Sequence, residues 1–384
     1  ELVRAIEATD AGTQLALDSA TDGLDLGSFL DVVHGHDLDR AIGVGLDLPE
    51  HGISVDVRFR EINARPVIAS LVLRIGDEMV EVSHSSNNAY QLASPRFRLP
   101  NWDGDRKVHE PKQDYRPGRA IELSERALED LGPTLNPKLR AAMVAVKDAF
   151  KKFHYLGPMR PPPAREVAWL QQDPTRLGSM GQETIQALIS NETGRDRGTL
   201  KTAVSAWLKR LDLADGIEVT QHGRSRRYEI EVLRGGNRSN LIDVGYGVSQ
   251  VLPVIVLLHF VPEGSVVLCE DPEAHLHPMA QAELADMFVE VARERKLQIL
   301  LETHSEHLFR RLQYLIADGK MRSDDCALYY VDREEPSSKL TTLEADEYGR
   351  VHNWPDNFFG DAIGEVERQT HKVFEHMMKR RARG

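Results

Sequence analysis

The stretch Ser265-Val-Val-Leu-Cys-Glu-Asp-Pro-Glu-Ala-His-Leu-His-Pro278 decides the fold class of this chain. Its apolar residues, Val266 to Cys269, predict a buried parallel strand. The strand runs into two adjacent carboxylates, Glu270 and Asp271. Nucleotide-binding α/β proteins deliver acids to the carboxyl edge of a sheet in this way, where the acids hold Mg²⁺ and position water. A core strand followed by an ordinary polar turn would explain the same residues, so the flanking sequence has to decide.

A second strand is predicted downstream, over Leu297-Gln-Ile-Leu-Leu-Glu302, and it ends in Thr303-His304-Ser305. Between the two strands, apolar residues of the segment 279–296 recur near a helical period, which predicts a helix. A strand, a helix and a strand of these lengths form a βαβ unit, whose strands are parallel and whose crossover is right-handed. The two carboxylates of the first strand and His304 are therefore expected together at one sheet edge.

Upstream, Asp243-Val-Gly-Tyr-Gly-Val-Ser-Gln250 opens the apolar run Val251 to Val261, which suits a buried helix. Glycines ahead of a helix N-terminus leave main-chain N–H groups open to an anion. The sequence thus predicts an anion-facing helix start shortly before the acidic strand.

These three segments, in this order and spacing, resemble the carboxyl half of an ABC-type ATPase head. More narrowly, they resemble the AAA-type ATPases related to the RecF, SMC and overcoming-lysogenisation-defect groups. Gly245–Gln250 is similar to the signature motif, Val266–Glu273 to Walker B with the start of the D-loop, and Thr303–Ser305 to the switch-histidine loop. Tyr155-Leu-Gly-Pro-Met-Arg160 resembles a segment that precedes the later half in this group. Asn353-Trp-Pro-Asp-Asn-Phe-Phe359 resembles the end of a C-terminal segment of uncharacterised function.

The resemblance implies an α/β fold. The expected architecture is an ABC-type head with a RecA-like parallel-sheet core, an antiparallel β subdomain and a helical insertion. The alternation in Ile53 to Arg60 independently predicts a half-buried antiparallel strand of a meander. We expect an N-terminal lobe over 1–125, a helical arm over 126–235, a C-terminal lobe over 236–335 and an extension over 336–384.

The resemblance also implies roles for single residues. Glu270 corresponds to the Mg²⁺-shell carboxylate, Asp271 to the acid that polarises water, and His304 to the sensor of the γ-phosphate. The remaining implied site residues are the signature contacts to ATP held by a second subunit (Gly245, Gly247, Ser249, Gln250), the D-loop residues at the dimer interface (Glu273, His275, His277) and a phosphate or interlobe contact (Arg160).

Two departures from the family pattern affect the chemistry. Family members carry Asp and then Glu at the end of Walker B, whereas this chain has Glu270 and then Asp271. Because Asp271 is one methylene shorter than the usual glutamate, we expect hydrolysis that is slow or that needs a partner to complete the site. The segment Gly245–Gln250 also lacks the Ser-Gly-Gly-Gln order, which leaves the register of Gly247 and Ser249 on the phosphate open.

The sequence contains no Gly-x-x-x-x-Gly-Lys-Ser/Thr loop to cradle phosphates. The segment Glu1-Leu-Val-Arg-Ala-Ile-Glu-Ala resembles the helix that follows this loop. We therefore expect the encoded protein to continue upstream of Glu1 through a strand and the loop. A degenerate head without this loop is the alternative.

The implied cofactors are ATP and Mg²⁺, bound between two heads of a homodimer or a higher even oligomer. The implied activity is ATP hydrolysis that controls an action on nucleic acid, through an effector partner of nuclease type. Stand-alone members of this group occur in bacterial anti-phage defence, so the resemblance implies such a role here.

Composition is consistent with these expectations. The chain has 384 residues, 41% of them hydrophobic, and a formal charge of −12, which argues against a surface that is basic throughout. Local basic clusters remain at Arg224, Arg226 and Arg227 and at Lys379–Arg383, although a solvated hairpin and a frayed tail explain them as well. The longest apolar run is too short for a membrane span. Two cysteines without a disulfide framework favour a reducing cytoplasm, and both are expected in strands.

Helices are expected along the stripe Leu139 to Phe153 and over Gln182–Ile189 and Thr199–Leu213, and a loop or an insertion over Asn87–Arg119. Two other functions compete with the ATPase. One is a non-hydrolysing scaffold that uses ATP only to dimerise. The other is a metal-dependent hydrolase built from Glu270, Asp271, His275, His277, Glu302, His304 and His307.

Overall fold

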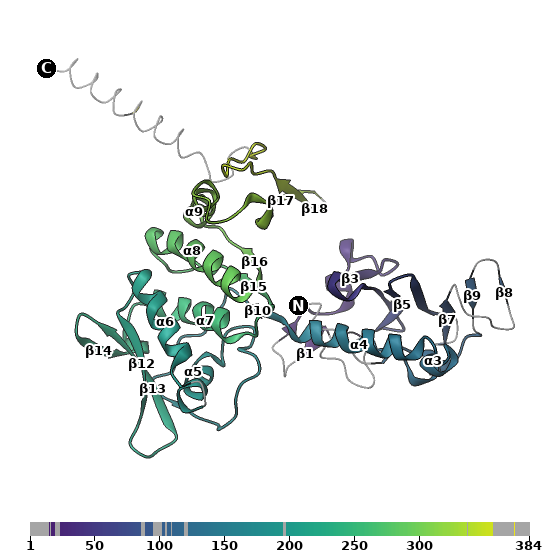
Figure 1. The fold of residues 1–384 in the computed structure, drawn as a ribbon, viewed down its shortest axis with the longest axis horizontal. Helices are drawn as coiled ribbons and strands as arrows, with labels where there is room; N and C mark the ends of the chain where they lie inside the picture. The colour runs from purple at the N-terminus through teal and green to yellow at the C-terminus, as the bar shows by residue number, and fades with distance from the viewer. Residues whose placement is uncertain are drawn as a thin grey trace.

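The computed structural model describes residues 15, 17–19, 24–85, 89–94, 102–103, 106–108, 110–118, 122–194, 197–335, 337–355 and 372. The predicted helix at Glu1, the basic segment Lys379–Arg383 and the end of the Asn353–Phe359 segment lie outside these residues. The described residues form two large apolar cores, one between Leu15 and Phe150 and one between Leu156 and Leu315, and a small third cluster of Phe309, Leu343 and Val351. Figure 1 shows the corresponding lobes, an antiparallel sheet with one long helix and a helix-rich lobe around a parallel sheet.

The parallel sheet of the C-terminal lobe has three described strands in the order β10 (Phe153–Leu156), β15 (Val266–Glu270) and β16 (Gln298–Glu302). Helix α8 (Pro278–Arg295) makes the crossover between β15 and β16. The register pairs Cys269 with Leu301 and Glu270 with Glu302. The predicted βαβ unit is confirmed, and its two acidic strand ends lie side by side.

Helix α7 (Tyr246–Phe260) begins inside the predicted signature and is buried from Val248 to Leu258. An apolar residue at almost every position explains this, because such a helix is stable only when it is covered on all sides. Helices α5 (Thr184–Thr193), α6 (Thr199–Arg210) and α8 share its core. The helices predicted from periodicity in this lobe are therefore confirmed. The following helix, α9 (Glu306–Ala317), begins at the N-cap Ser305.

A second small sheet borders this lobe. Strand β13 (Arg227–Arg234) pairs antiparallel with β11 (Val167–Ala168), β12 (Gly216–Gln221) and β14 (Asn237–Asn240). A short 3₁₀ turn, η6 (Leu241–Asp243), connects β14 to the start of α7. This antiparallel sheet is therefore joined to the predicted signature by only a few residues.

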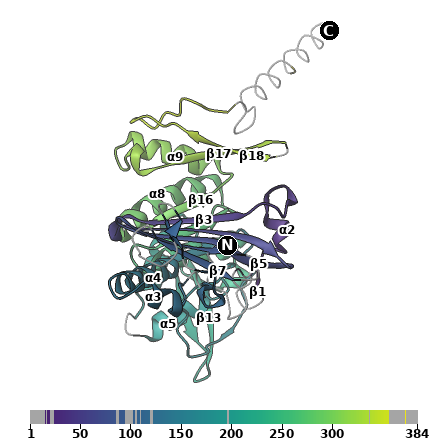
Figure 2. The same cartoon turned by 90° about the vertical axis from the view of Figure 1, so that its right-hand side faces the viewer.

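The N-terminal lobe is built on a seven-stranded antiparallel sheet in the order β3-β4-β5-β6-β7-β9-β8. Apolar side chains alternate along β4 and face the core, as the sequence predicted. Helix α4 buries its stripe against the sheet core (Figures 1 and 2). The bounds are β3 (Ile42–Leu48), β4 (Ile53–Ile62), β5 (Arg65–Ile75), β6 (Glu78–His84), β7 (Tyr90–Ser94), β8 (Trp102–Asp103), β9 (Arg106–Val108), α3 (Glu125–Asp130) and α4 (Asn136–Lys151).

The predicted fold class is confirmed, since a parallel α/β core and an antiparallel β subdomain are both present. The remaining elements are short. They are β1 (Asp18–Ser19), β2 (Leu24–Asp25), α2 (Phe29–Val32), η1 (His34–His36), η2 (Pro49–His51), η4 (Gln113–Tyr115), η7 (Ser323–Asp325), β17 (Leu328–Glu334) and β18 (Ser337–Leu343).

Three local predictions were wrong. The segment Asn87–Arg119 is not simply a loop, because β7 lies inside it and joins the large sheet through β6 and β9. Phe153 is not the last residue of a helical stripe, because it begins β10 and pairs with Val266. Cys326 lies at the end of the η7 turn and not in a strand, whereas Cys269 is buried in β15; both are free thiols.

None of the helices in the described part of the chain combines the length and the apolar character needed to traverse a bilayer.

Candidate functional site

The carboxyl edge of the parallel sheet gathers three polar side chains. Asp271, Glu302 and His304 each place one donor atom within 4.8 Å of the other two. His304 Nε2 lies 3.1 Å from Glu302 Oε1, and the Asp271 main-chain N–H donates to the Glu302 carbonyl at 3.1 Å. The parallel register produces this arrangement, because both strands end at the same level of the sheet.

The main chain at Asp271 has a φ of +44°, in the left-handed region. Aspartate and asparagine are enriched several-fold in that region among residues with a side chain, because their short polar side chains tolerate it. The strand therefore turns sharply out of the sheet at Asp271. This geometry gives a physical reason for an aspartate where the family pattern has a glutamate.

The charges in this cluster influence one another. Burial raises the pKa of the Glu302 carboxyl, the nearby Asp271 carboxylate raises it further, and His304 acts in the opposite direction. Glu302 entered the sequence analysis only as a ligand of the metal-hydrolase alternative. Its register partner is Glu270, the predicted Mg²⁺ residue, which is half-buried and does not belong to the three-residue group.

Glu273 faces the interior. Its side chain is 6% exposed, and its Oε1 accepts hydrogen bonds from Thr303 Oγ1 at 2.6 Å and from the His304 main-chain N–H at 2.9 Å. The residue predicted for a dimer interface thus holds the loop that carries His304. Because the Glu273 carboxylate is buried within its own chain, it does not lie on a surface that a second subunit could contact.

Arg160 is also buried, with 4% exposure. Its guanidinium donates to the main-chain carbonyls of Glu270 at 2.7 Å, Asp271 at 3.2 Å and Gln250 at 3.3 Å. The side-chain amide of Gln250, which is 2% exposed, donates back to the Arg160 carbonyl at 3.2 Å. Both residues therefore tie the end of β15 to α7, and neither was predicted in that role.

The start of α7 presents different residues to solvent from those the sequence suggested. Gly245, the N-cap, and Tyr246 are exposed, whereas Ser249 is 7% exposed and its hydroxyl donates to the Tyr246 carbonyl at 2.8 Å. A Cβ on Gly247 would lie 2.9 Å from the His275 carbonyl oxygen. Gly247 therefore allows the predicted signature to pack directly against the predicted D-loop.

The two histidines of the predicted D-loop are exposed. His275 has a φ of +65° and meets the Tyr246 ring edge to face, with 4.8 Å between the ring centroids. His277 is the N-cap of α8, where its Nδ1 accepts from the Met279 N–H. Neither histidine belongs to the group around Asp271. Of the seven ligands of the metal-hydrolase alternative, the described structure brings together only Asp271, Glu302 and His304.

Two family models match the chain. Residues 134–310 match the model described as "AAA domain, putative AbiEii toxin, Type IV TA system". Residues 321–369 match the model described as "Protein of unknown function (DUF3696)". The predicted resemblance to an ABC-type ATPase head with a C-terminal segment of uncharacterised function is thereby confirmed.

Curated relatives and solved structures are more distant. The "Methionine import ATP-binding protein MetN 2" of two Pseudomonas aeruginosa strains, UCBPP-PA14 and PAO1, is 26% identical over 197 residues, which is 46% of this chain. The chain spans 52% of the length of these relatives. The SMC head domain from Thermotoga maritima is 10% identical, with 81% of each chain covered and a TM-score of 0.32.

A structure described as "Structural biochemistry of ATP-driven dimerization and DNA stimulated activation of SMC ATPases" is similar at 18% identity and a TM-score of 0.29. It covers 38% of this chain and 83% of that chain.

Proposed function

We propose that this chain, which carries an AAA-type ATPase domain over residues 134–310, binds ATP with Mg²⁺ and hydrolyses it slowly as a head that dimerises on the nucleotide. The observation that carries the proposal is the grouping of Asp271, Glu302 and His304 at the carboxyl edge of the parallel sheet. Ligands of α/β proteins bind outside the carboxyl ends of the strands, which is where these side chains lie.

The donor atoms at this edge suit Mg²⁺. The ion prefers carboxylate oxygens and keeps several waters, and Asp271, Glu302 and the neighbouring Glu270 supply such oxygens. Glu270 would hold the ion, as the family resemblance implies. The bound ion would neutralise charge on the phosphates.

The protein's own groups would then position water and phosphate. The Asp271 carboxylate would accept a hydrogen bond from the attacking water and align it with the phosphorus. His304, whose side chain is 83% exposed, would donate to the γ-phosphate, with Glu302 holding its ring at 3.1 Å. Slow turnover follows from the short Asp271 side chain, because efficient catalysis depends on the placement of the reacting atoms to within an ångström.

The start of α7 would meet ATP held by a second subunit. Free N–H groups and the positive end of the helix dipole at the exposed Gly245 and Tyr246 suit a phosphate. Gly247 would bring them close to the D-loop. The structure motivates a refined assignment for two predicted contacts: Ser249 and Gln250 are buried, so the main chain of the first turn would make the contact in place of their side chains.

The biological setting is also proposed. A nucleotide-gated head of this kind would control an action on nucleic acid through an effector partner of nuclease type, in anti-phage defence in the cytoplasm. The description of the matched family, a putative toxin of a type IV toxin–antitoxin system, supports the proposed role in anti-phage defence.

The metal-dependent hydrolase stays the second candidate, because Asp271, Glu302 and His304 also form a set that suits a transition metal. The two functions differ in what they bind alone. Stoichiometric binding of Mn²⁺ or Zn²⁺ to the nucleotide-free protein, measured by calorimetry, would favour the hydrolase.

The deciding experiment uses the full-length protein and measures phosphate release from ATP together with molar mass by light scattering. We expect slow hydrolysis and an ATP-dependent dimer. Gly245→Arg should keep binding of a fluorescent ATP analogue, because the added side chain has open space within its own chain. It should abolish the dimer, because the same side chain would fill the space proposed for the nucleotide of the second subunit. Gly43→Arg, at an exposed glycine of β3 with equally open surroundings, is the matched control. ATP binding without hydrolysis would instead support the scaffold, and normal dimerisation of Gly245→Arg would contradict the site in trans.

A further inference from the structure

The hairpin of β12 and β13 projects from the C-terminal lobe, with its tip pointing away from the parallel sheet (Figures 1 and 2). The tip has the sequence His222-Gly-Arg-Ser-Arg-Arg227, which contains three arginines and no acid. In a chain with a formal charge of −12, this turn is a local concentration of positive charge.

Two of the three arginines at the tip are available to a partner. Arg224 and Arg226 are exposed, and within the described residues neither guanidinium makes an ion pair or a hydrogen bond. Arg227 is 68% exposed and pairs with Glu166 at 3.2 Å. The cost of binding a charged partner is low when the cations are solvated and not already committed to carboxylates.

The main chain of the tip is held in place. The Ser225 N–H and hydroxyl both donate to the His222 carbonyl, at 3.0 Å and 2.8 Å, and the Ser225 hydroxyl accepts from the Arg227 N–H at 3.1 Å. The N–H of Trp169, the residue after strand β11, donates to the Arg226 carbonyl at 2.8 Å. The arginine side chains therefore start from an ordered turn, which lowers the entropy lost on binding.

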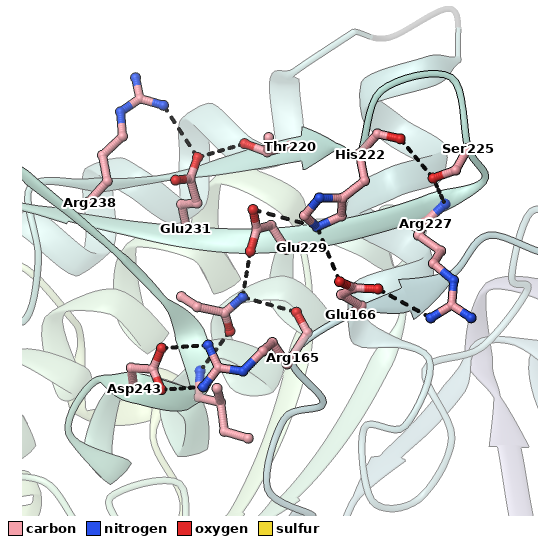
Figure 3. A network of polar contacts seen from close by, with 12 residues as sticks. Arg165, Glu166, Thr220, His222, Ser225, Arg227, Glu229, Glu231, Arg238 and Asp243 are labelled. Carbon is pink, nitrogen blue, oxygen red and sulfur yellow. Dashed lines mark hydrogen bonds and ion pairs between the residues drawn. The ribbon is translucent and has the colours of Figure 1, made fainter.

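Polar contacts lead from the tip toward the predicted signature (Figure 3), with one step at His222 that is longer than a hydrogen bond. Glu166 contacts Arg227 at 3.2 Å and His222 at 3.8 Å, and His222 lies 3.6 Å from Glu229. Asn240, which is 9% exposed, donates to Glu229 at 2.7 Å and to the Arg165 carbonyl at 2.9 Å.

Arg165 closes the path with a bidentate pair to Asp243, at 2.6 Å and 2.7 Å. The Asn240 side chain also accepts from the Ile242 N–H at 3.2 Å, so both ends of the η6 turn are held. Asp243 lies two residues before Gly245, the N-cap of α7. The hairpin and the η6 turn are thus linked through side chains, and the turn lies directly before the start of α7.

We propose that the tip of the β12–β13 hairpin binds the phosphate backbone of a nucleic acid, and that the Arg165–Asp243 pair couples this binding to the position of the signature helix. The coupling rests on the proposed ATPase function, whereas the binding does not. Arginine forks match phosphate oxygens bidentately, and contacts of this kind position a protein without reading its sequence.

The residues of the tip distinguish nucleic acid from other anionic partners. An anionic membrane would favour apolar side chains beside the cations, but the tip carries only Gly and Ser between its charges. The nearest aromatic residues, Trp169 and Tyr228, are half-buried and buried and pack against each other with ring centroids 6.1 Å apart. Stacking on bases is therefore not expected, and binding should depend strongly on salt.

The first experiment measures binding of a fluorescent 30-base-pair DNA duplex to the full-length protein by anisotropy, without nucleotide, over a range of salt. Arg224→Glu with Arg226→Glu should weaken binding by roughly tenfold or more and lower the slope against log salt by about 2. Lys138→Glu with Lys209→Glu, an equal change of charge at exposed helix positions, should leave binding near that of the parent.

Three outcomes would overturn the proposal. The first is no DNA binding by the parent protein, and the second is an equal loss of DNA binding in the two double variants. The third is an arginine variant that binds DNA like the parent but binds phosphatidylserine vesicles more weakly. Because this experiment contains no ATP, its result stands even if the ATPase proposal fails.

The second experiment tests the coupling. The coupling predicts that DNA speeds ATP hydrolysis by the parent protein. Arg165→Ala should retain DNA binding but lose this stimulation. The charge exchange Arg165→Asp with Asp243→Arg should restore the stimulation, because it re-forms the ion pair with its charges reversed. Full stimulation of Arg165→Ala by DNA would show that the pair does not carry the coupling.

Discussion

The Glu273 carboxylate accepts a hydrogen bond from the main-chain N–H of His304 at 2.9 Å. A residue just after one strand therefore holds the loop at the end of the next strand, 31 residues further along the chain. The main chain of the loop bearing His304 is held by the buried Glu273 carboxylate, while the His304 ring remains exposed. This arrangement allows the ring to be positioned without being enclosed.

Removal of this support should disturb both the fold and the site. We expect Glu273→Ala to lower the free energy of unfolding by about 1–3 kcal/mol, because it leaves the His304 N–H and the Thr303 hydroxyl without their acceptor. Urea denaturation followed by circular dichroism measures this. Glu294→Ala, at an exposed position of α8, should change stability little. Equal stabilities of the two variants would contradict the role given to Glu273.

Loss of the Asp271 charge should disable hydrolysis and spare nucleotide binding. We expect Asp271→Asn to lower the rate of phosphate release on the order of a hundredfold, because the amide cannot polarise the attacking water as the carboxylate does. The change should also prolong the ATP-bound dimer, measured by light scattering. Parent-like turnover would assign the water to another residue.

Asp271→Gly controls for the strained main chain, because glycine adopts a φ of +44° at no steric cost. Its melting temperature should equal or exceed that of the parent while its turnover stays low. Such a result would separate the loss of the carboxylate from any loss of fold.

The predicted signature and D-loop should be sensitive to a single methyl group at Gly247. A Cβ there would lie 2.9 Å from the His275 carbonyl oxygen, so Gly247→Ala must push the two segments apart. We expect a loss of about 1–3 kcal/mol in stability, measured by thermal melting and urea denaturation. At Gly245 a Cβ meets nothing within 4 Å, so Gly245→Ala should cost clearly less. A larger loss at Gly245 would contradict the packing described here.

Stability should fall in mild acid because of a buried histidine in β10. Burial, and to a lesser degree Arg176, lowers the pKa of His154 from 6.5 to about 4. Between these two values the unfolded chain binds a proton that the folded chain does not. The contribution to stability is therefore complete above pH 6.5 and is lost as the pH falls toward 4.

Between pH 7.5 and pH 5 this residue should account for a loss of about 2 kcal/mol, seen as a lower melting temperature. The histidine of α7, His259, shifts in the same direction and should add to the effect. His154→Leu should flatten the pH dependence, whereas His34→Leu, at an exposed position, should not. An unchanged pH profile in His154→Leu would refute the assignment.

Much of the fold could be predicted because it depends on local pattern. The apolar run before Glu270 and the helical period over 279–296 predicted β15 and α8. The failures occurred where distant partners decide. Strand β7 forms inside a polar, proline-rich segment because β6 and β9 pair with it. Phe153 leaves the helical stripe because β15, which lies far along the chain, pairs with it.

The sequence by itself determined which residues reach the carboxyl edge of the sheet, because the end of each strand places them there. Only the tertiary structure decided which way they face. Glu273, Ser249, Gln250 and Arg160 all lie in motifs that predicted contact with ATP or a partner, yet all four are buried. The reason is that α7 and the two strand ends pack closely here. Main-chain groups taken out of water must be hydrogen-bonded, and these side chains supply the partners.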